Sequence, residues 1–446
     1  MNTILPEMMP LKALCTDKGQ YGLNVPQEEY SKSGVRLLRT SDLDVSGQYA
    51  ADGIYVRGEV EERFLVSEGD LLFSRSGTIG QVFQVPAALD GASFAGFLIR
   101  FRTRQDRALS RYVYYTAQSP IVQDQIKRNA ISSTISNFNA ARYASTLLPV
   151  FDRSTQSLIV RYLDNAELRI AQAIAAKQSM LSLLMERYAV ASEQLVLGRL
   201  DNIDLAESGV PWIGQIPDHW DLVPLRSLLQ LRKRTVGGRH KDFQLLSLTL
   251  KGVIVRDLAQ MKGKFPSSFD TYQEVRPGDF VFCNFDVEET PRVVGLANDL
   301  GMITGAYDVF ECRQPEVRGY LNQFLLTVDQ GKKFASLYRG MRKTISRSDL
   351  LAATIPLPPP DERRVLVEKV MRHKAQTEGA LDAVRAEIAL LREYRTKLIS
   401  DVVTGKLDVR EEAAKMSDVD PAELAAVLAG GSTNSDTQED EDDADN

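Results

Sequence analysis

The longest regular pattern in the sequence runs from Asp361 to Thr404, where inward positions recur three and four residues apart. These positions are Val367, Val370, Lys374, Thr377, Leu381, Val384, Ile388, Leu391, Arg395, Leu398 and Val402. A heptad seam sustained for about five repeats predicts a long helix that packs lengthwise against another helix. The proline run that ends at Pro360 and the following Gly405 mark the two ends of this helix.

A second long helix is predicted from Ser154, because no glycine or proline occurs before Gly198 and the composition favours helix. Its seam consists of Leu163, Ala166, Ile170, Ala173, Leu181, Leu184, Tyr188, Ala191 and Leu195. Steps of four residues through Lys177 join the two parts of this seam, and such a stutter slightly unwinds a supercoil. Since each helix has an incomplete apolar stripe, we expect the two to form an antiparallel coiled coil with each other.

The remaining sequence contains an internal repeat. Residues 10–14 (PLKAL) match 224–228 (PLRSL), and 66–75 (VSEGDLLFSR) match 275–284 (VRPGDFVFCN). Residues 133–150 (STISNFNAARYASTLLPV) are matched with 343–360 (KTISRSDLLAATIPLPPP), and each is followed directly by a long helix. Blocks that keep their order predict a duplicated unit of about 210 residues, with a pseudo-twofold relation between its copies.

Short β-type runs separated by turn residues indicate that both globular regions are mixed α/β (α+β) domains. The boundaries that we predict are 1–153 for the first domain, 154–198 for the first helix, 199–224 for a linker, 225–360 for the second domain, 361–405 for the second helix, and 406–446 for a C-terminal segment with a disordered acidic tail.

Composition excludes several classes of protein. The three cysteines show no CxxC spacing and only three histidines accompany them, so we expect neither a disulfide framework nor a metal site. No apolar stretch is long enough to span a membrane and no signal sequence is present, which predicts a cytoplasmic protein. The net charge of −6 arises from the acidic tail. Without this tail the chain is about +4, a balance compatible with nucleic-acid binding.

The two repeats differ in the loops that follow their matched strands, and both carry basic clusters. An antiparallel pair of long helices with one domain on each helix would match the dyad symmetry of B-DNA, so unlike loops predict a bipartite, asymmetric site. The DNA-binding candidates are Arg75, Ser76, Thr78, Arg102, Arg104, Arg232, Lys233, Arg234, Arg239, Lys241, Asn284, Arg292, Arg342 and Lys343. The candidates for helix pairing and partner docking are Leu163, Ile170, Leu184, Leu195, Leu381, Val384, Ile388, Leu391 and Leu398.

Several motifs make the chain resemble the specificity subunit, HsdS, of type I restriction-modification systems. The motifs are WIGQIPDHW (212–220), the SRSGTIGQV loop (74–82), TIS before the proline run, PLPPPDERR leading into the second helix, and LREYRTKLISDVVTGKLDVRE (391–411). The first domain departs from the family pattern, since it begins with ILPEMMPLKAL (4–14) in place of a tryptophan-rich motif, and the acidic tail is atypical.

The resemblance implies two target recognition domains, each reading one half of a split DNA site, and a helical spacer that docks two DNA methyltransferase subunits. Two restriction and translocase subunits would complete the complex. S-adenosylmethionine, ATP and Mg²⁺ would belong to those partners, and the chain itself would need no cofactor.

Two other readings stay open at this stage. A self-contained DNA-modifying enzyme would need a nucleotide-binding loop, a nuclease motif or a methyltransferase box, and the sequence contains no GxxxxGK[ST], no Glu-x-Lys or Asp-x-Lys and no NPPY or DPPY. A coiled-coil scaffold without affinity for DNA would leave the paired domains unexplained. We therefore expect a non-catalytic subunit, in which His219 and its neighbouring tryptophans form a folded cap.

Overall fold

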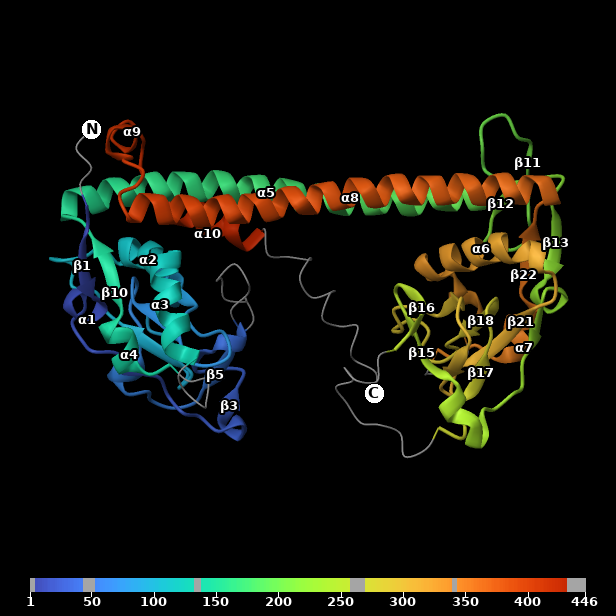
Figure 1. Ribbon diagram of the computed structural model, residues 1–446, viewed down its shortest axis with the longest axis horizontal. Coiled ribbons are helices and arrows are strands. Elements are labelled where there is room, and N and C mark those ends of the chain that lie inside the picture. The colour runs from blue at the N-terminus through green and yellow to red at the C-terminus, as the bar shows by residue number, and fades with distance from the viewer. Residues whose placement is uncertain (1–4, 43–52, 132–137, 257–268, 339–342, 431–446) are drawn as a thin grey trace. The chain divides into compact units, whose positions relative to one another are not determined.

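The computed structural model describes residues 5–42, 53–131, 138–256, 269–338 and 343–430. The chain forms two compact units, one of residues 1–180 with 384–435 and the other of residues 181–383 with 436–446. Each long helix contributes one part to each unit, so that a unit consists of a mixed globular domain and a segment of both helices (Figure 1). The predicted fold class of α+β domains with two long helices is confirmed.

Within its described residues, the domain of the first unit contains ten short strands in a two-stranded and two four-stranded sheets. The pair is β1 (Glu7–Pro10) with β10 (Leu147–Val150). The first four-stranded sheet has the order β2 (Gln20–Tyr21), β9 (Leu98–Phe101), β6 (Leu71–Ser74) and β7 (Val82–Gln84). The second has the order β3 (Tyr30–Ser31), β5 (Ile54–Val56), β4 (Val35–Leu38) and β8 (Ser93–Phe94).

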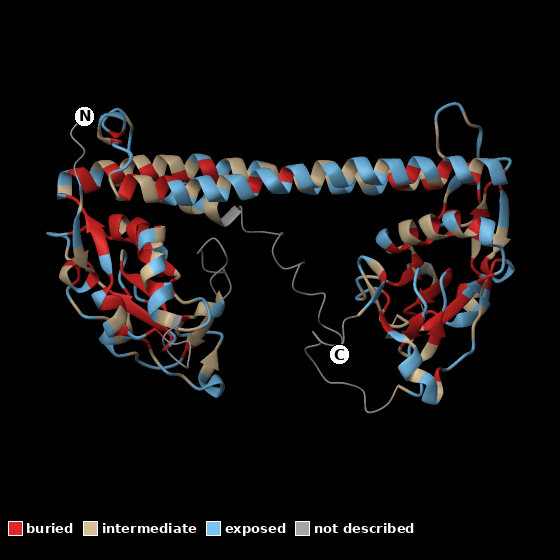
Figure 2. Ribbon diagram, in the orientation of Figure 1, coloured by how far each residue is buried: buried red, intermediate tan, exposed pale blue. Residues whose placement is uncertain are grey.

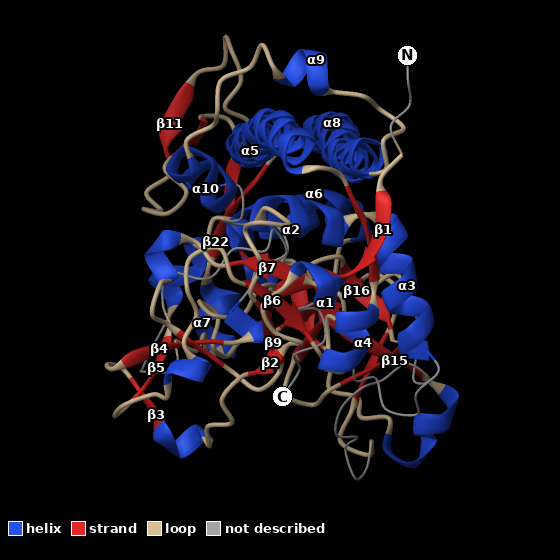
Figure 3. Ribbon diagram, turned by 90° about the vertical axis from the view of Figure 1, so that its left-hand side faces the viewer, coloured by secondary structure: helices blue, strands red, loops and turns tan. Residues whose placement is uncertain are grey.

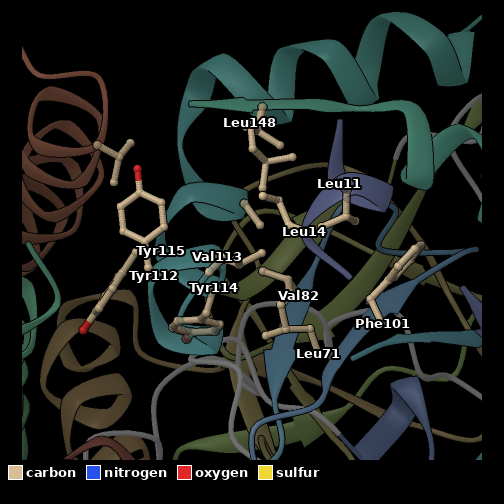
Figure 4. Close-up of a cluster of buried hydrophobic side chains, with 14 of the residues drawn as sticks. Leu11, Leu14, Leu71, Val82, Phe101, Tyr112, Val113, Tyr114, Tyr115 and Leu148 are labelled. Carbon is tan, nitrogen blue, oxygen red and sulfur yellow. The ribbon is translucent and has the colours of Figure 1, made fainter. Parts of the chain in front are cut away.

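Four helices accompany these strands: α1 (Leu11–Leu14), α2 (Ser110–Gln118), α3 (Pro120–Ile131) and α4 (Ala140–Ser145). The core lies where α2 packs against β7 and the neighbouring strands. Tyr112 and Tyr115 of α2 are fully buried in it, together with aliphatic residues of the strands (Figure 4). Burial of apolar side chains at about 25 cal/mol per Å² is the main force that holds such a small domain together.

The domain of the second unit repeats this plan. Its pair is β13 (Asp221–Pro224) with β22 (Thr354–Leu357). The first four-stranded sheet has the order β14 (Leu229–Leu231), β21 (Asp308–Cys312), β18 (Asp279–Phe282) and β19 (Val294–Leu296). The other has the order β16 (Gly252–Val255), β15 (Gln244–Thr249), β20 (Gly301–Ile303) and β17 (Gln273–Val275). Helices α6 (Arg318–Gln330) and α7 (Arg347–Ala352) correspond to α2 and α4.

The two domains are matched down to individual turns. A glycine with positive φ precedes a buried aspartate in each, Gly69 before Asp70 and Gly278 before Asp279. In both, the aspartate accepts a hydrogen bond from the backbone N–H three residues earlier, at 2.8 Å from Ser67 and 2.9 Å from Arg276. Because a left-handed turn favours glycine and a buried carboxylate needs donors, the shared GD pair follows from this turn.

The predicted match of residues 133–150 with residues 343–360 is wrong by three residues. The hydrogen bond from Phe138 to the carbonyl of Arg75 corresponds to the one from Ile345 to the carbonyl of Asn284, both at 2.9 Å. In the strand pairs, Leu147 then takes the place of Thr354 rather than that of Leu357. The repeated TIS letters therefore do not mark equivalent positions; in the first repeat they lie outside the described residues. What both repeats share is a helix N-cap, Asn139 in α4 and Ser346 in α7.

The long helices are α5 (Arg153–Val196) and α8 (Pro360–Val403), which are seen end-on and side by side in Figure 3. Their segments pack antiparallel, since residues later in α5 contact residues earlier in α8. Arg395 of α8 binds Glu167 of α5 in the first unit. In the second unit Tyr188 of α5 stacks on His373 of α8, with 5.4 Å between ring centroids. Core residues of each domain continue into the adjoining helix segments, so helices and domain fold as one body within each unit (Figure 2).

The interface positions correct the predicted seams. In α5 the inward positions include Glu167, which is only 6% exposed, and Ile174. With these two residues the seam of α5 alternates between steps of four and three residues and contains no stutter. The inward positions of α5 are Leu163, Glu167, Ile170, Ile174, Lys177, Leu181, Leu184, Tyr188, Ala191 and Leu195. In α8 Lys374 is exposed and His373 faces inward, so the stutter lies in α8 around Thr377. The other seam residues predicted for α8 are buried or half-buried.

The predicted disorder of the C-terminal segment is wrong for its first part. Helices α9 (Arg410–Ala413) and α10 (Pro421–Gly430) follow α8, and Leu424 of α10 is buried. Arg161 of α5 binds Asp418 at 2.6 Å, which attaches this segment to the first unit. The apolar residues among the acids of 416–430 supply the contacts that disorder would lack. The most acidic stretch, residues 431–446, lies outside the described residues.

The linker that contains WIGQIPDHW includes β11 (Leu205–Glu207) and β12 (Gln215–Pro217) and packs on the second domain. Trp220 meets Tyr320 edge to face and donates a hydrogen bond of 2.9 Å to Glu362. His219 also binds Glu362, which raises the pKa of this histidine. These contacts define a structural cap where α8 begins.

All three cysteines are free and buried, and burial raises the pKa of Cys15 to about 12. Among the described residues, His, Cys, Asp and Glu side chains form no cluster that could hold a metal ion. Within the same ranges, no helix has the length and apolar character needed to cross a membrane.

Candidate nucleic-acid interface

In the first unit, the candidate site begins where β6 ends. Arg75 follows this strand, and its backbone N–H donates to the carbonyl of Phe97 at 2.9 Å. The guanidinium of Arg75 lies over the ring of Tyr21, 5.0 Å from its centroid. Tyr21 accepts a hydrogen bond of 3.0 Å from the backbone N–H of Ala140, at the start of α4. Three separate segments thus fix this arginine and tyrosine together.

The same surface exposes aromatic rings. Phe97 is 61% exposed and Tyr21 is 37% exposed, which is unusual for aromatic side chains beside a well-packed core. Thr78 is exposed as well, and its hydroxyl bonds Ser74 and Gln81. Ser76 is half-buried and its carbonyl accepts from Ser74. Guanidinium, hydroxyl and aromatic groups on one face are suited to hydrogen bonding and stacking with nucleic-acid bases.

Arg102 and Arg104, the other candidates in this unit, lie away from the Arg75 loop. Leu71 at the start of β6 pairs with Phe101, whereas Ser74 at its end pairs with Leu98, so Arg102 lies near the opposite end of the strand. Its guanidinium binds both carboxylate oxygens of Asp70, each at 2.8 Å. Arg104 pairs with Asp106 on the surface. Arg102 therefore serves chiefly to neutralise the buried aspartate of the GD turn.

In the second unit, Asn284 follows β18 at the position equivalent to Arg75. Asn284 is buried, with 8% exposure, and its side-chain N–H donates to Asp308 at 2.7 Å. Arg347, the first residue of α7, donates from Nε to the other oxygen of Asp308 at 2.7 Å. Asp308 is itself only 4% exposed, whereas the side chain of Arg347 is 57% exposed. The surface group here is thus the arginine and not the asparagine.

Arg292 and Lys343 flank the same loop but are engaged by acids. Arg292 binds Asp329 at 3.2 Å, and burial raises the pKa of this aspartate. Lys343 pairs with Glu288. Because the loop also carries further acidic residues, its charge is less favourable to DNA than that of its counterpart in the first unit. Of the two flanking candidates, Lys343 has the more exposed side chain.

The basic stretch after β14 divides into a buried and an exposed part. Arg232 lies between Asp279 and Glu311, with 2.7 Å from Nε to Asp279, and so has the structural role that Arg102 has in the first unit. The remaining candidates of this stretch are exposed and suited to phosphate contacts: Lys233, Arg234, Arg239 and Lys241. Arg239 also lies 3.8 Å from Glu274.

Arg342 lies outside the described residues. The sequence analysis missed Tyr21, Phe97 and Asp308, and Arg347 is not among its DNA-binding candidates. A signal was present for Asp308, because an aspartate directly before the apolar pair Val309 and Phe310 needs a partner when that segment is buried. Nothing in the sequence indicated that this partner is the arginine at the start of α7.

The comparisons with known proteins agree with this architecture. No family model matches the sequence, and no curated protein matches it. A solved chain described as the structural basis of complex assembly and conformational transition of the type I R-M system has a TM-score of 0.61 with this chain. The two are 15% identical, and the match covers 91% of this chain and 100% of that chain. The protein therefore has the fold of a chain from a type I restriction-modification system.

Two further solved structures match over a similar extent. The HsdS subunit of Thermoanaerobacter tengcongensis is 16% identical, with a TM-score of 0.46, and the match covers 90% of this chain and 97% of that one. The type I restriction-modification S subunit of M. genitalium is 12% identical, with a TM-score of 0.36 and the same coverage.

Proposed function

We propose that this protein is the DNA-specificity subunit of a type I restriction-modification complex. In this proposal its two domains recognise the unlike halves of a bipartite, asymmetric DNA site. The observation that supports it is the duplicated domain whose two copies carry different groups near the end of the matched strand, Arg75 over Tyr21 in one copy and Arg347 of α7 bound to the buried Asp308 in the other. A shared scaffold with different reading groups is what an asymmetric split site requires.

The long helices would set the distance between the half-sites and dock two methyltransferase subunits. Each helix has 44 residues, which corresponds to about 66 Å at about 1.5 Å per residue. The predicted docking residues lie in the seam between the helices, where pairing uses them. Exposed apolar side chains elsewhere on the helices are better placed to meet a partner: Met180, Leu183, Met185 and Val190 on α5, and Leu390 and Tyr394 on α8.

Catalysis would belong to the partner subunits, which include the methyltransferase subunits and, for cleavage, the restriction and translocase subunits. These partners would bring S-adenosylmethionine, ATP and Mg²⁺. A self-contained DNA-modifying enzyme is less well supported, because the surface groups around Arg75 and Arg347 are hydrogen-bond donors and aromatic rings rather than an acid–base pair. A scaffold without DNA affinity would leave exposed Phe97 and Tyr21 without a role.

The proposal is tested by co-expressing the full chain with a methyltransferase subunit and sequencing the methylated adenines of the host DNA. We expect co-purification and methylation at a single motif with two unlike halves separated by a fixed gap. Methylation of the same sites without this chain, or of a contiguous motif, would contradict the proposal.

A domain exchange provides the control. Replacing residues 1–153 with the corresponding domain of a homologue should change one half of the methylated motif and leave the other half intact, because each unit has its own core. If both halves changed, the two domains would not read DNA independently.

A further inference from the structure

Both domains carry an arginine near the end of the matched strand, but the two arginines come from different elements. By strand register, Phe73 pairs with Ile99 in the first domain and Phe282 pairs with Asp308 in the second, so Asp308 occupies the place of Ile99. Arg347 begins α7 as Ala140 begins α4. The strand-end residue changes from arginine to asparagine, while the first residue of the helix changes from alanine to arginine. The guanidinium therefore belongs to the strand end in the first domain and to the helix in the second, where the carboxylate of Asp308 lies beside it.

Both oxygens of the Asp308 carboxylate have hydrogen-bond partners. One oxygen accepts from the amide of Asn284 at 2.7 Å, and the other lies 2.7 Å from Nε and 2.6 Å from Nη2 of Arg347. Since Asp308 is nearly inaccessible to water, this ion pair is strong and fixes the orientation of the guanidinium. Asn284 holds the carboxylate in turn, which explains why this residue is buried.

The remaining donors of Arg347 face outward. With Nε and one N–H of Nη2 held by Asp308, the edge formed by Nη1 and Nη2 stays available, and the side chain is 57% exposed. Two parallel donors on one edge match O6 and N7 of guanine, the commonest specific contact of arginine in the major groove. A phosphate contact needs no such orientation, because it tolerates a flexible point charge.

We propose that Arg347 reads a guanine in the half-site recognised by the second unit, and that Asp308 and Asn284 are positioning residues for it. This inference rests on the proposed function and assigns one reading residue within it. Lys233 is an exposed cation on the same side of the domain, since Leu231 pairs with Phe310 and the next residue, Arg232, donates to the carbonyl of Val309, which brings the chain towards Asp308. It would contact the phosphate backbone beside the base.

The experiment compares full-length variants in complex with the methyltransferase subunits, using sequencing of methylated adenines to measure the base preference at each position of the motif. The variants are Arg347→Ala, Arg347→Lys and Asp308→Asn. Arg226→Ala is the control, since Arg226 is an exposed arginine of the same unit whose neighbour Leu225 donates to the carbonyl of Ala353, at the end of α7 opposite to Arg347. Thermal unfolding of each complex verifies that the variant is folded.

We expect Arg347→Ala to reduce the preference for guanine at one position of one half-site by roughly 10- to 100-fold, with the other half-site unchanged. Arg347→Lys should not restore this preference, because an ammonium cannot form both bonds. Asp308→Asn should relax the same position, an effect that a purely structural role would not confine to one base pair. Arg226→Ala should leave the motif as it is.

A uniform loss of methylation without any change of motif would overturn the inference and identify Arg347 as a phosphate contact. An unchanged motif and rate would overturn it as well. Failure of the proposed function would look different, because the complex with the unmodified chain would then show no split motif at all.

Discussion

At the scale of single residues, buried charges rather than apolar side chains distinguish this chain from a simple coiled coil. Arg395 lies in the α8 seam and binds both carboxylate oxygens of Glu167 at 2.7 Å. It also donates to Gln118 of α2 at 3.0 Å, which joins the domain of the first unit to both helices. Nearby, Arg111 and Tyr115 of α2 bind Asp164 of α5. The polar seam position that the sequence showed at 395 is thus a register contact.

Removing one partner of this buried pair should be costly. Arg395→Ala is expected to lower the stability of the first unit by about 3 kcal/mol or more, because it leaves the Glu167 carboxylate buried without its counter-ion. Hydrogen exchange of α5 and α8 amides in increasing denaturant would measure the change. The exposed Lys374 of the same helix is the control, and Lys374→Ala should cost less than about 0.5 kcal/mol. Equal losses for both variants would refute the register role.

At the scale of secondary-structure elements, α8 contains one glycine and is followed by another, and the two have different effects on the helix. Gly379 lies within α8, and a Cβ at this position would meet no other atom. Gly405, just after the helix, instead has φ of +75°, a conformation that side chains other than glycine rarely adopt. The same residue type therefore weakens the helix in one place and ends it in the other.

The same substitution should accordingly have opposite effects at these two glycines. Gly379→Ala is expected to stabilise α8 by about 0.5–1 kcal/mol, since it removes backbone entropy from the unfolded chain and creates no clash. Gly405→Ala is expected to destabilise the chain by about 1 kcal/mol, because alanine is strained in the left-handed region. Urea midpoints of the two variants would decide. Destabilisation by Gly379→Ala would mean that α8 needs a flexible point there.

At the scale of the whole molecule, duplication accounts for most of the architecture. Each domain shares its core with one segment of α5 and one segment of α8, so these helix segments bury apolar surface of the domain. The same plan is used twice with different surface residues. We expect this arrangement to allow a recognition domain to change its target without loss of the frame that carries it.

The proposed spacer function leads to a test by insertion. Residues 174–180 of α5 and 382–388 of α8 face each other through the Lys177–Glu387 ion pair, and they lie away from the α8 stutter. Duplicating both segments adds one heptad to each helix and should widen the gap in the methylated motif by about 3 base pairs, since a heptad is roughly 10 Å long. Methylation at the original spacing would show that helix length does not set the gap.

An insertion of one heptad in α5 alone is the matched control. It would break the register between the helices, so we expect loss of the folded pair rather than a motif with intermediate spacing. A functional complex with the normal motif would indicate that the helices do not act as a paired spacer.

The sequence by itself determined the large elements. Heptad spacing and the lack of glycine and proline located both long helices to within a few residues of α5 and α8, because helix formation depends on local periodicity and end signals. Matched blocks that keep their order predicted the duplication, and the GD pair in one of these blocks proved to be the same left-handed glycine before a buried aspartate in both domains. Arg75 is half-buried and follows the matched strand, and its contact with DNA stays a prediction.

Tertiary structure decided which polar side chains are structural and which are available at the surface. Arg102 and Arg232 looked like DNA-binding residues, but each binds the buried aspartate of its own GD turn. Glu167, and not the predicted Ala166, lies in the seam of α5, because Arg395 binds it across the helix pair. Burial of a charge depends on a partner that is distant in sequence, and periodicity carries no information about that partner. For the same reason only the folded chain shows Asp308 beneath Arg347, the pair on which the proposed reading of guanine depends.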